Sequence, residues 1–302
     1  MPLTVKSASL IATLVFAASP GQAQTNLSTQ EIVEFDSPEG WAMAYMTASS
    51  LNLGQMPPRS TSLGDFVFSA ELGSIPALNE DQQQVGFGGF KDEDLNKSPV
   101  FGRARASLGL IWDVTAELSY TPPLKIDGAK PDGLWGIALS RPLLDLGDWG
   151  FGLRVFAQEG EVRADVTCSA EVATQPPQTV ANPFGCTAPS NDRMVMDHYG
   201  AEVIFSLVEL PLGIRPWVSL AVTRMDPFVQ LEAQLLGSLD LSTLDSKGTT
   251  ETVSVGLVYR VNDSWRINVA SSYTPLDVNR PPGNPGGQDN FWNLRLGLAW
   301  DF

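Results

Sequence analysis

The sequence has little of what enzymatic, metal-binding and nucleic-acid-binding sites are usually made from. Its 302 residues include one histidine and two cysteines, and only 18% of them are charged. The formal charge is -15, and no lysine or arginine run is present that could displace counterions from phosphates. Zinc-type sites need clustered His and Cys ligands, which this chain lacks. We therefore expect no nucleic-acid partner, no cofactor and no metal.

Long hydrophobic runs are also missing after residue 23, which excludes a transmembrane helix there. The only apolar run, residues 10–18, follows Lys6 and precedes Gly21-Gln22-Ala23, which has small residues at the two positions that a signal peptidase reads. The run is shorter than the ~20 residues that span a bilayer. We expect residues 1–23 to be a cleaved signal peptide.

What is present instead is period-two alternation. In the last strand one face carries only large apolar side chains and the other face carries Asn293, Arg295, Gly297 and Ala299. The apolar face consists of Trp292, Leu294, Leu296, Leu298, Trp300 and Phe302. Aromatic residues at both ends of an apolar strip match the two interfacial girdles of a membrane barrel. Because a sheet in hydrocarbon cannot leave backbone groups unpaired, it must close.

This strand, with Trp300 and a terminal Phe302, resembles the assembly signal of bacterial outer-membrane proteins. Residues 94–103 and 182–186 resemble parts of poorly characterised, roughly ten-stranded proteobacterial barrels. The resemblance implies an integral protein of the Gram-negative outer membrane, in contact with its lipids and lipopolysaccharide. It also implies insertion by the outer-membrane assembly machinery.

Similar alternation recurs through residues 64–302, separated by connections that are alternately short and long. We predict an all-β, closed antiparallel transmembrane barrel of ten strands over this range. A twelve-stranded version remains open, with residues 229–239 as a further strand. The long connections belong to the extracellular side and both barrel ends to the periplasmic side.

Residues 24–63 are expected to form an N-terminal periplasmic segment. Ser37-Pro38-Glu39 is a good helix start, with an N-cap, a proline in the first turn and an acid at the positive end of the helix dipole. Trp41, Ala44, Tyr45 and Ala48 then share one helical face. We predict a short helix over about residues 38–53, below or inside the barrel.

The inward positions of the predicted strands are rich in arginine. The candidate lumen-lining residues are Arg103, Arg105, Glu117, Arg154, Glu202, Arg215, Arg266 and Arg295, with Glu71 among the opposed acids. A ring of arginines can select anions in a pore. Alternatively, the charges form a salt-bridge network that fills a narrow lumen, which ten strands would favour because barrels of about eight strands are filled by their side chains.

Cys168 and Cys186 lie in one long connection, where an exported protein is expected to form a disulfide. The single histidine, His198, follows Asp197. The chain resembles the omptin surface proteases, which use an Asp–His pair, in strand count. However, adjacent strand residues point to opposite faces, so these two cannot form such a pair. We interpret His198 as a surface residue and assign no catalytic residue.

Three functions remain compatible with the sequence. The first is a non-enzymatic barrel, either a narrow passive pore or a structural component with an arginine-lined lumen. The second is a surface-binding barrel that acts through its long extracellular loops. The third is an outer-membrane hydrolase. The sequence leaves the solute, the ligand and the oligomeric state open.

Overall fold

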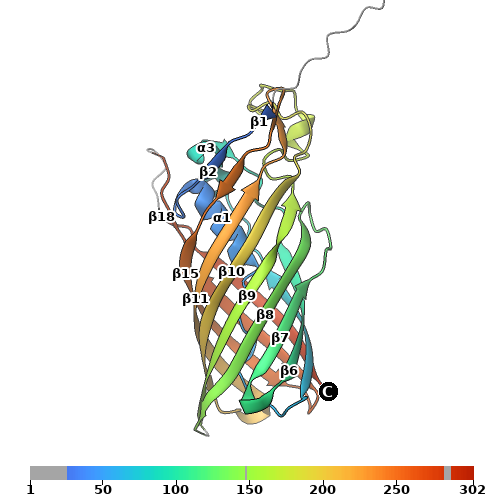
Figure 1. Cartoon of the computed structure of the whole chain (residues 1–302), viewed down its shortest axis with the longest axis vertical. Coiled ribbons are helices and arrows are strands. Elements are labelled where there is room, and N and C mark those ends of the chain that lie inside the picture. The colour runs from blue at the N-terminus through green and yellow to red at the C-terminus, as the bar shows by residue number, and fades with distance from the viewer. Residues whose placement is uncertain (1–25, 147, 282–286) are drawn as a thin grey trace, which may run out of the picture.

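Ten antiparallel strands form one closed ring (Figure 1). The computed structural model describes residues 26–146, 148–281 and 287–302, so the expected signal peptide lies outside the described residues. The ring consists of β3 (Phe66–Ser74), β6 (Val100–Gly109), β7 (Thr115–Thr121), β8 (Lys130–Asp145), β9 (Trp149–Ala164), β10 (Asp192–Leu207), β11 (Ile214–Gln230), β15 (Gly248–Arg260), β16 (Trp265–Thr274) and β19 (Phe291–Asp301). The predicted all-β barrel of ten strands is confirmed.

Closure joins the first ring strand to the last. β19 pairs with β3 in antiparallel register, Leu298 opposite Ala70, and β3 pairs in turn with β6, Ala70 opposite Ala104. Because every ring strand has two neighbours, no open sheet edge faces the surroundings in the middle of the barrel.

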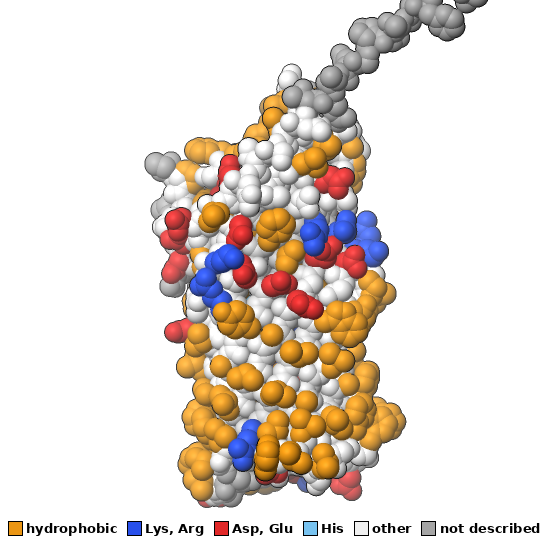
Figure 2. Space-filling view, viewed as in Figure 1, with side chains coloured by type: hydrophobic (Ala, Val, Ile, Leu, Met, Phe, Trp, Pro, Cys, Tyr) orange, Lys and Arg blue, Asp and Glu red, His pale blue; other side chains and the backbone are white. Residues whose placement is uncertain are grey.

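The outer face of the ring carries a band of apolar side chains. In β19, Leu294, Leu296 and Leu298 are 44–57% exposed. The alternate residues Asn293 and Arg295 are buried. Figure 2 shows the band over the lower part of the barrel, with most charged side chains gathered above it. A closed sheet with such an exterior is an integral outer-membrane β-barrel.

Aromatic pairs lie near both borders of this band. Trp265 stacks on Trp300 at the end where the chain finishes, with 5.6 Å between ring centroids. Tyr273 packs on Trp292 at the other end of the same strand pair. Amphipathic rings of this kind sit at the lipid–water interfaces, which confirms the girdles expected from the last strand.

The two ends of the barrel differ in their connections. Short turns, including the 3-10 helices η1 (Ile111–Asp113) and η3 (Pro211–Gly213), lie at the end that we assign to the periplasm. At the extracellular end, β8, β9, β10 and β11 run for 16 or 17 residues and form a tall wall, whereas β7 has seven residues. Because about ten residues of a tilted strand cross a bilayer, this wall extends beyond the membrane.

The extracellular connections add small elements above the ring. Cys168 and Cys186 form the predicted disulfide, with 5.7 Å between their Cα atoms. Residues 229–239 form the end of β11 and most of a hairpin, and no further ring strand, so the twelve-stranded alternative is wrong. The short elements are α2 (Glu80–Gln83), α3 (Gly86–Gly89), η2 (Val172–Thr174), β4 (Gln84–Val85), β5 (Lys91–Asp92), β12 (Ala233–Leu235), β13 (Ser238–Asp240), β14 (Thr243–Asp245), β17 (Asp277–Val278) and β18 (Gly287–Gln288).

In the described residues, the N-terminal segment does not lie below the barrel: it begins at the extracellular end and runs through the lumen to the periplasmic end, where Arg59 binds Asp301. β1 (Asn26–Leu27) and β2 (Gln30–Ile32) pair with β13 and β14 at the extracellular end (Figure 1). Helix α1 (Pro38–Ser49) then enters the lumen, and its Ser37 cap and Pro38 start are as predicted, although it ends four residues early. The helix is buried on nearly all sides and so needs the cover that the lumen provides. Among the described residues, no helix is both long and apolar enough to cross a membrane.

Candidate functional site

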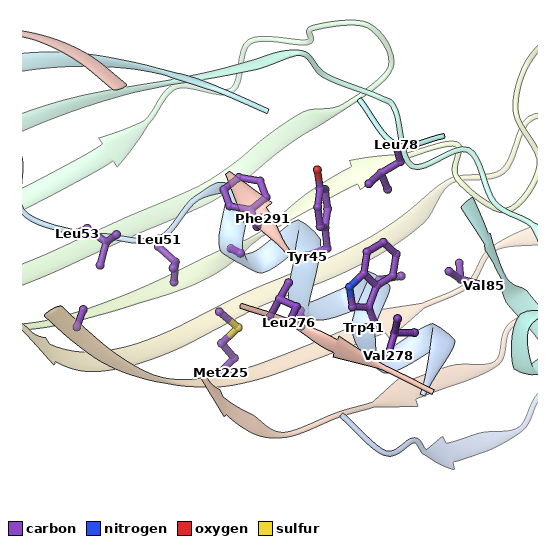
Figure 3. Close-up of a cluster of buried hydrophobic side chains, with 14 of the residues drawn as sticks. Trp41, Tyr45, Leu51, Leu53, Leu78, Val85, Met225, Leu276, Val278 and Phe291 are labelled. Carbon is purple, nitrogen blue, oxygen red and sulfur yellow. The ribbon is translucent and has the colours of Figure 1, made fainter. Parts of the chain in front are cut away.

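We call residues 38–58, helix α1 and the irregular segment after it, the plug. Its helical part is held by apolar packing against extracellular segments (Figure 3). Trp41 and Tyr45 pack on one another, and Tyr45 meets Phe291 edge to face with ring centroids 5.1 Å apart. The indole of Trp41 donates a hydrogen bond to the carbonyl of Asp289 (3.0 Å), and the Tyr45 hydroxyl donates to that of Pro76 (3.1 Å). Both buried aromatic residues thus satisfy their polar atoms.

The irregular part of the plug is held by arginines of the barrel wall. Four successive backbone carbonyls each accept a hydrogen bond from a different guanidinium: Ser50 from Arg103, Leu51 from Arg295 (3.0 Å), Asn52 from Arg154 and Leu53 from Arg105 (3.0 Å). A buried chain without a strand partner would otherwise leave these carbonyls unpaired, at considerable cost in free energy. The arginines therefore replace the neighbouring strand that this segment lacks.

The N–H groups of the same segment also find side-chain partners. Asn52 donates its backbone N–H to Nε2 of His198 (3.1 Å), and Gly54 donates to Oε2 of Glu202 (2.8 Å). Since Nε2 accepts, His198 is neutral with its proton on Nδ1, which donates to the carbonyl of Met196 (3.1 Å). The interpretation of His198 as a surface residue is wrong: its side chain is buried and holds the plug. Asp197 instead accepts from the N–H of Gly160.

Buried carboxylates neutralise three of these four arginines. Arg105 binds Glu71 and Glu117, each at 2.6 Å, and Glu117 also binds Arg154 at 2.7 Å. Arg295 binds the other oxygen of Glu71 at 3.2 Å. Such a buried network is stable only when every member is paired, because a lone buried charge is very costly. Within the described residues, each of these guanidinium groups is bound by carboxylates or by plug carbonyls, so they do not form a ring of free cations around a passage.

The eight predicted lumen residues fall into two groups. Six meet at the plug: Arg103, Arg105, Glu117, Arg154, Glu202 and Arg295. The other two, Arg215 and Arg266, lie at the periplasmic end. Arg266 binds Asp301 (2.6 Å), which also binds Arg59, and Arg215 borders a cavity of about 320 Å³ there.

Sequence reasoning missed the plug residues that receive these contacts. Oδ1 of Asn52 accepts from Arg103 (3.3 Å) and from Arg105 (3.2 Å). Its Nδ2 donates to the carbonyls of Ile137 (3.3 Å) and Ala157 (3.4 Å). The only available signal was a helix that is apolar on more than one face, which indicates that some other part of the chain must cover it.

A large apolar cavity lies beside the plug. It has a volume of about 630 Å³ and is lined on the inside by Tyr45, Met46 and Met196. Its outer lining includes Leu72 and Leu296, which belong to the lipid-facing band. A smaller cavity, about 170 Å³, lies above it between α1 and the tall wall and shares Met46 with it. The smaller cavity lies on the extracellular side of the arginine network, whose members Glu71 and Arg103 border the larger one.

Solved structures with a similar fold are outer-membrane proteins. The outer membrane protease OmpT from Escherichia coli is 12% identical, covering 80% of this chain and 94% of that chain, with a TM-score of 0.39. An outer membrane channel from Pseudomonas putida F1 is 11% identical, covering 84% and 100%, with a TM-score of 0.40. Ail, the attachment invasion locus protein of Yersinia pestis, is 10% identical, covering 80% and 100%, with a TM-score of 0.30.

No protein-family model matches the chain, and no curated protein matches it. At these identities and TM-scores, the three structures assign no activity to it. Protease, channel and attachment protein all occur among them, so the function has to be argued from the site itself.

Proposed function

We propose that this chain is a closed, non-enzymatic outer-membrane barrel that binds a ligand from its extracellular half and does not conduct solutes passively. One observation carries the proposal: the arginines that could have lined a pore bind the plug backbone from Ser50 to Leu53. A filled lumen leaves the cavities on the extracellular side as the place where another molecule can be held. Outer-membrane lipids and the assembly machinery remain the proposed partners.

The same geometry argues against the hydrolase alternative. A general base must offer a free nitrogen or oxygen to a substrate or a water. Nε2 of His198 is occupied by the N–H of Asn52, and Nδ1 is occupied by the carbonyl of Met196. We therefore assign His198 to the plug contact and not to catalysis.

Conductance in planar bilayers tests this proposal. We expect the wild-type protein to stay close to baseline. Arg103→Gln should give frequent openings, because Arg103 binds Ser50, Leu51 and Asn52 while making no ion pair among the described residues. Ser254→Ala is the matched control, since Ser254 lies in the lumen and bonds only to Ser272. A steady open step in the wild-type protein would overturn the proposal.

A further inference from the structure

The barrel wall has a notch on its extracellular side, between β6 and β8. Strand β7 ends at Thr121 because Pro122 and Pro123 follow and have no N–H to donate to a ladder. The last pair between β6 and β7 is Ala104 opposite Tyr120. β6 continues beyond it as far as Val100, paired there with β3 alone.

The 630 Å³ cavity fills this notch and extends from it over the outer face of β3 and β19. From β6 it is lined by Phe101 to Ala104, and across the notch by Thr121 and Leu134. Its lining also joins the lipid-facing Leu72, which is 58% exposed, to the interior Met196, which is 3% exposed. The cavity therefore passes through the wall and connects the apolar band to the space beside α1. Its volume lies within the range of about 300–1,000 Å³ that small-molecule sites occupy.

The charged groups around the cavity are already engaged by other parts of the chain. Arg103 is bound to the plug and Glu71 to Arg105 and Arg295. Lys97 is neutralised by Asp94 (2.6 Å) and Asp165 (3.1 Å). Among the described residues of the lining, the hydroxyl of Thr121 is the one buried side-chain group without a hydrogen-bond partner. Such a surface suits an uncharged hydrocarbon and offers nothing to a free ionic group.

The inner wall is also adaptable. Met46 and Met196 line it, and Met43 and Met194 pack behind them in one cluster with Leu134. Unbranched thioether side chains repack readily around a flexible ligand. A rigid ligand would instead be expected to meet a wall of branched or aromatic side chains.

We propose that this pocket binds one acyl chain, which enters through the notch from the lipid-facing side. The head group stays outside, near the stacked rings of Tyr120 and Trp135, whose centroids are 4.2 Å apart. Continuity between the cavity and the apolar band identifies hydrocarbon as the occupant, because hydrocarbon is what surrounds that band. This inference deepens the proposed function by naming the ligand class.

A pair of tryptophan substitutions on one strand tests the pocket. Ala104→Trp places an indole in the outer lining of the notch. Ala106→Trp is the matched control, because Ala106 lies on the same outer face of β6, two residues nearer the periplasm and outside the described lining. A tryptophan on a lipid-facing strand is well tolerated in both cases.

Native mass spectrometry after reconstitution with phosphatidylethanolamine, with and without added palmitate, gives the readout. We expect one retained adduct on the wild-type protein and on Ala106→Trp, and about a tenfold or greater loss on Ala104→Trp. The adduct mass identifies the source, an intact lipid or the free fatty acid. Equal adducts on all three proteins, or none on any, would overturn the pocket. Conductance of the same samples tests the closed lumen independently, so failure of one proposal is distinguishable from failure of the other.

Discussion

The two sides of the lumen are built on different principles. One side, formed by β3, β6, β7, β9, β10 and β19, carries the four arginines and the Glu202 that bind the plug, together with Glu71 and Glu117, which bind those arginines. We call it the charged wall. The other side, β11, β15 and β16, is rich in small hydroxyl and amide residues on its inner face, and we call it the hydroxyl wall. Two pairs of its hydroxyls bond to one another, Thr252 with Thr274 (2.8 Å) and Ser254 with Ser272 (2.9 Å).

The difference shows how the plug is attached. In the described part of the chain, no hydrogen bond joins the hydroxyl wall to residues 50–55. Long guanidinium side chains can reach the centre of the barrel from the strand backbone, whereas a serine or threonine reaches only its neighbour across the sheet. The plug is therefore fixed by polar contacts to one wall, and disturbing the two walls should have unequal effects.

The largest effect should follow from removing the centre of the charged wall. Arg105→Met leaves Glu71 and Glu117 with one cationic partner fewer each, and breaking a buried pair typically costs about 3–5 kcal/mol. We expect a marked fall in the temperature at which the barrel loses its compact migration on gels. An unchanged temperature would show that the charged wall does not stabilise the fold.

A smaller effect should come from the plug side of the same contacts. Asn52→Ala removes the side chain that accepts from Arg103 and Arg105, and the loss of such buried hydrogen bonds costs about 1–3 kcal/mol. We expect faster proteolysis of the N-terminal segment, while the barrel itself keeps its compact migration on gels until it is heated. Equal loss of barrel and plug would mean that the two unfold as one unit.

The hydroxyl wall should respond least of the two walls. Ser254→Ala removes one hydrogen bond to Ser272, which contributes about 0.5–1.5 kcal/mol. Barrel stability should fall slightly and protease protection of the plug should remain as in the wild-type protein. Release of the plug in this variant would contradict its one-sided attachment.

The effect least connected to the plug is expected outside both walls, in the extracellular loop that carries Glu93. Burial raises the pKa of this carboxyl to about 8 from its ordinary value of 4.5, although Lys91 at 2.6 Å opposes the shift. A carboxyl with a raised pKa in the folded state contributes most below pH 4.5, and that contribution is lost as the pH rises towards 8. We expect loop protection against proteases to decline over this window, and Glu93→Gln to remove the decline without moving the plug.

The sequence predicts the barrel well because lipid and lumen impose opposite demands on alternate residues. The outward Leu294 and the inward Arg295 are assigned correctly from neighbouring positions alone. The start of α1 can also be predicted from neighbouring residues, because Ser37 caps the helix and Pro38 begins it. The assembly role of Trp300 and Phe302 stays a prediction.

The plug and the pocket could not be predicted in this way. Contacts between Asn52 and Arg103 join segments that no local pattern relates, and a position before the first strand does not reveal whether a segment lies below the barrel or inside it. The notch depends on where β7 stops relative to β6, a difference of a few residues that alternation does not reveal. Whether an arginine lines a channel or holds a chain depends on what occupies the lumen.

The position of Trp41 in the lumen constrains the order of assembly. The plug and the inward side chains fill the bore of this ring, so a helix carrying an indole cannot be threaded through it afterwards. We expect Trp41 to reach its packed environment before β3 and β19 pair, or together with them. The N-terminal residues would then move to the cell surface inside a still open sheet, and the pairing of β3 with β19 would enclose them there.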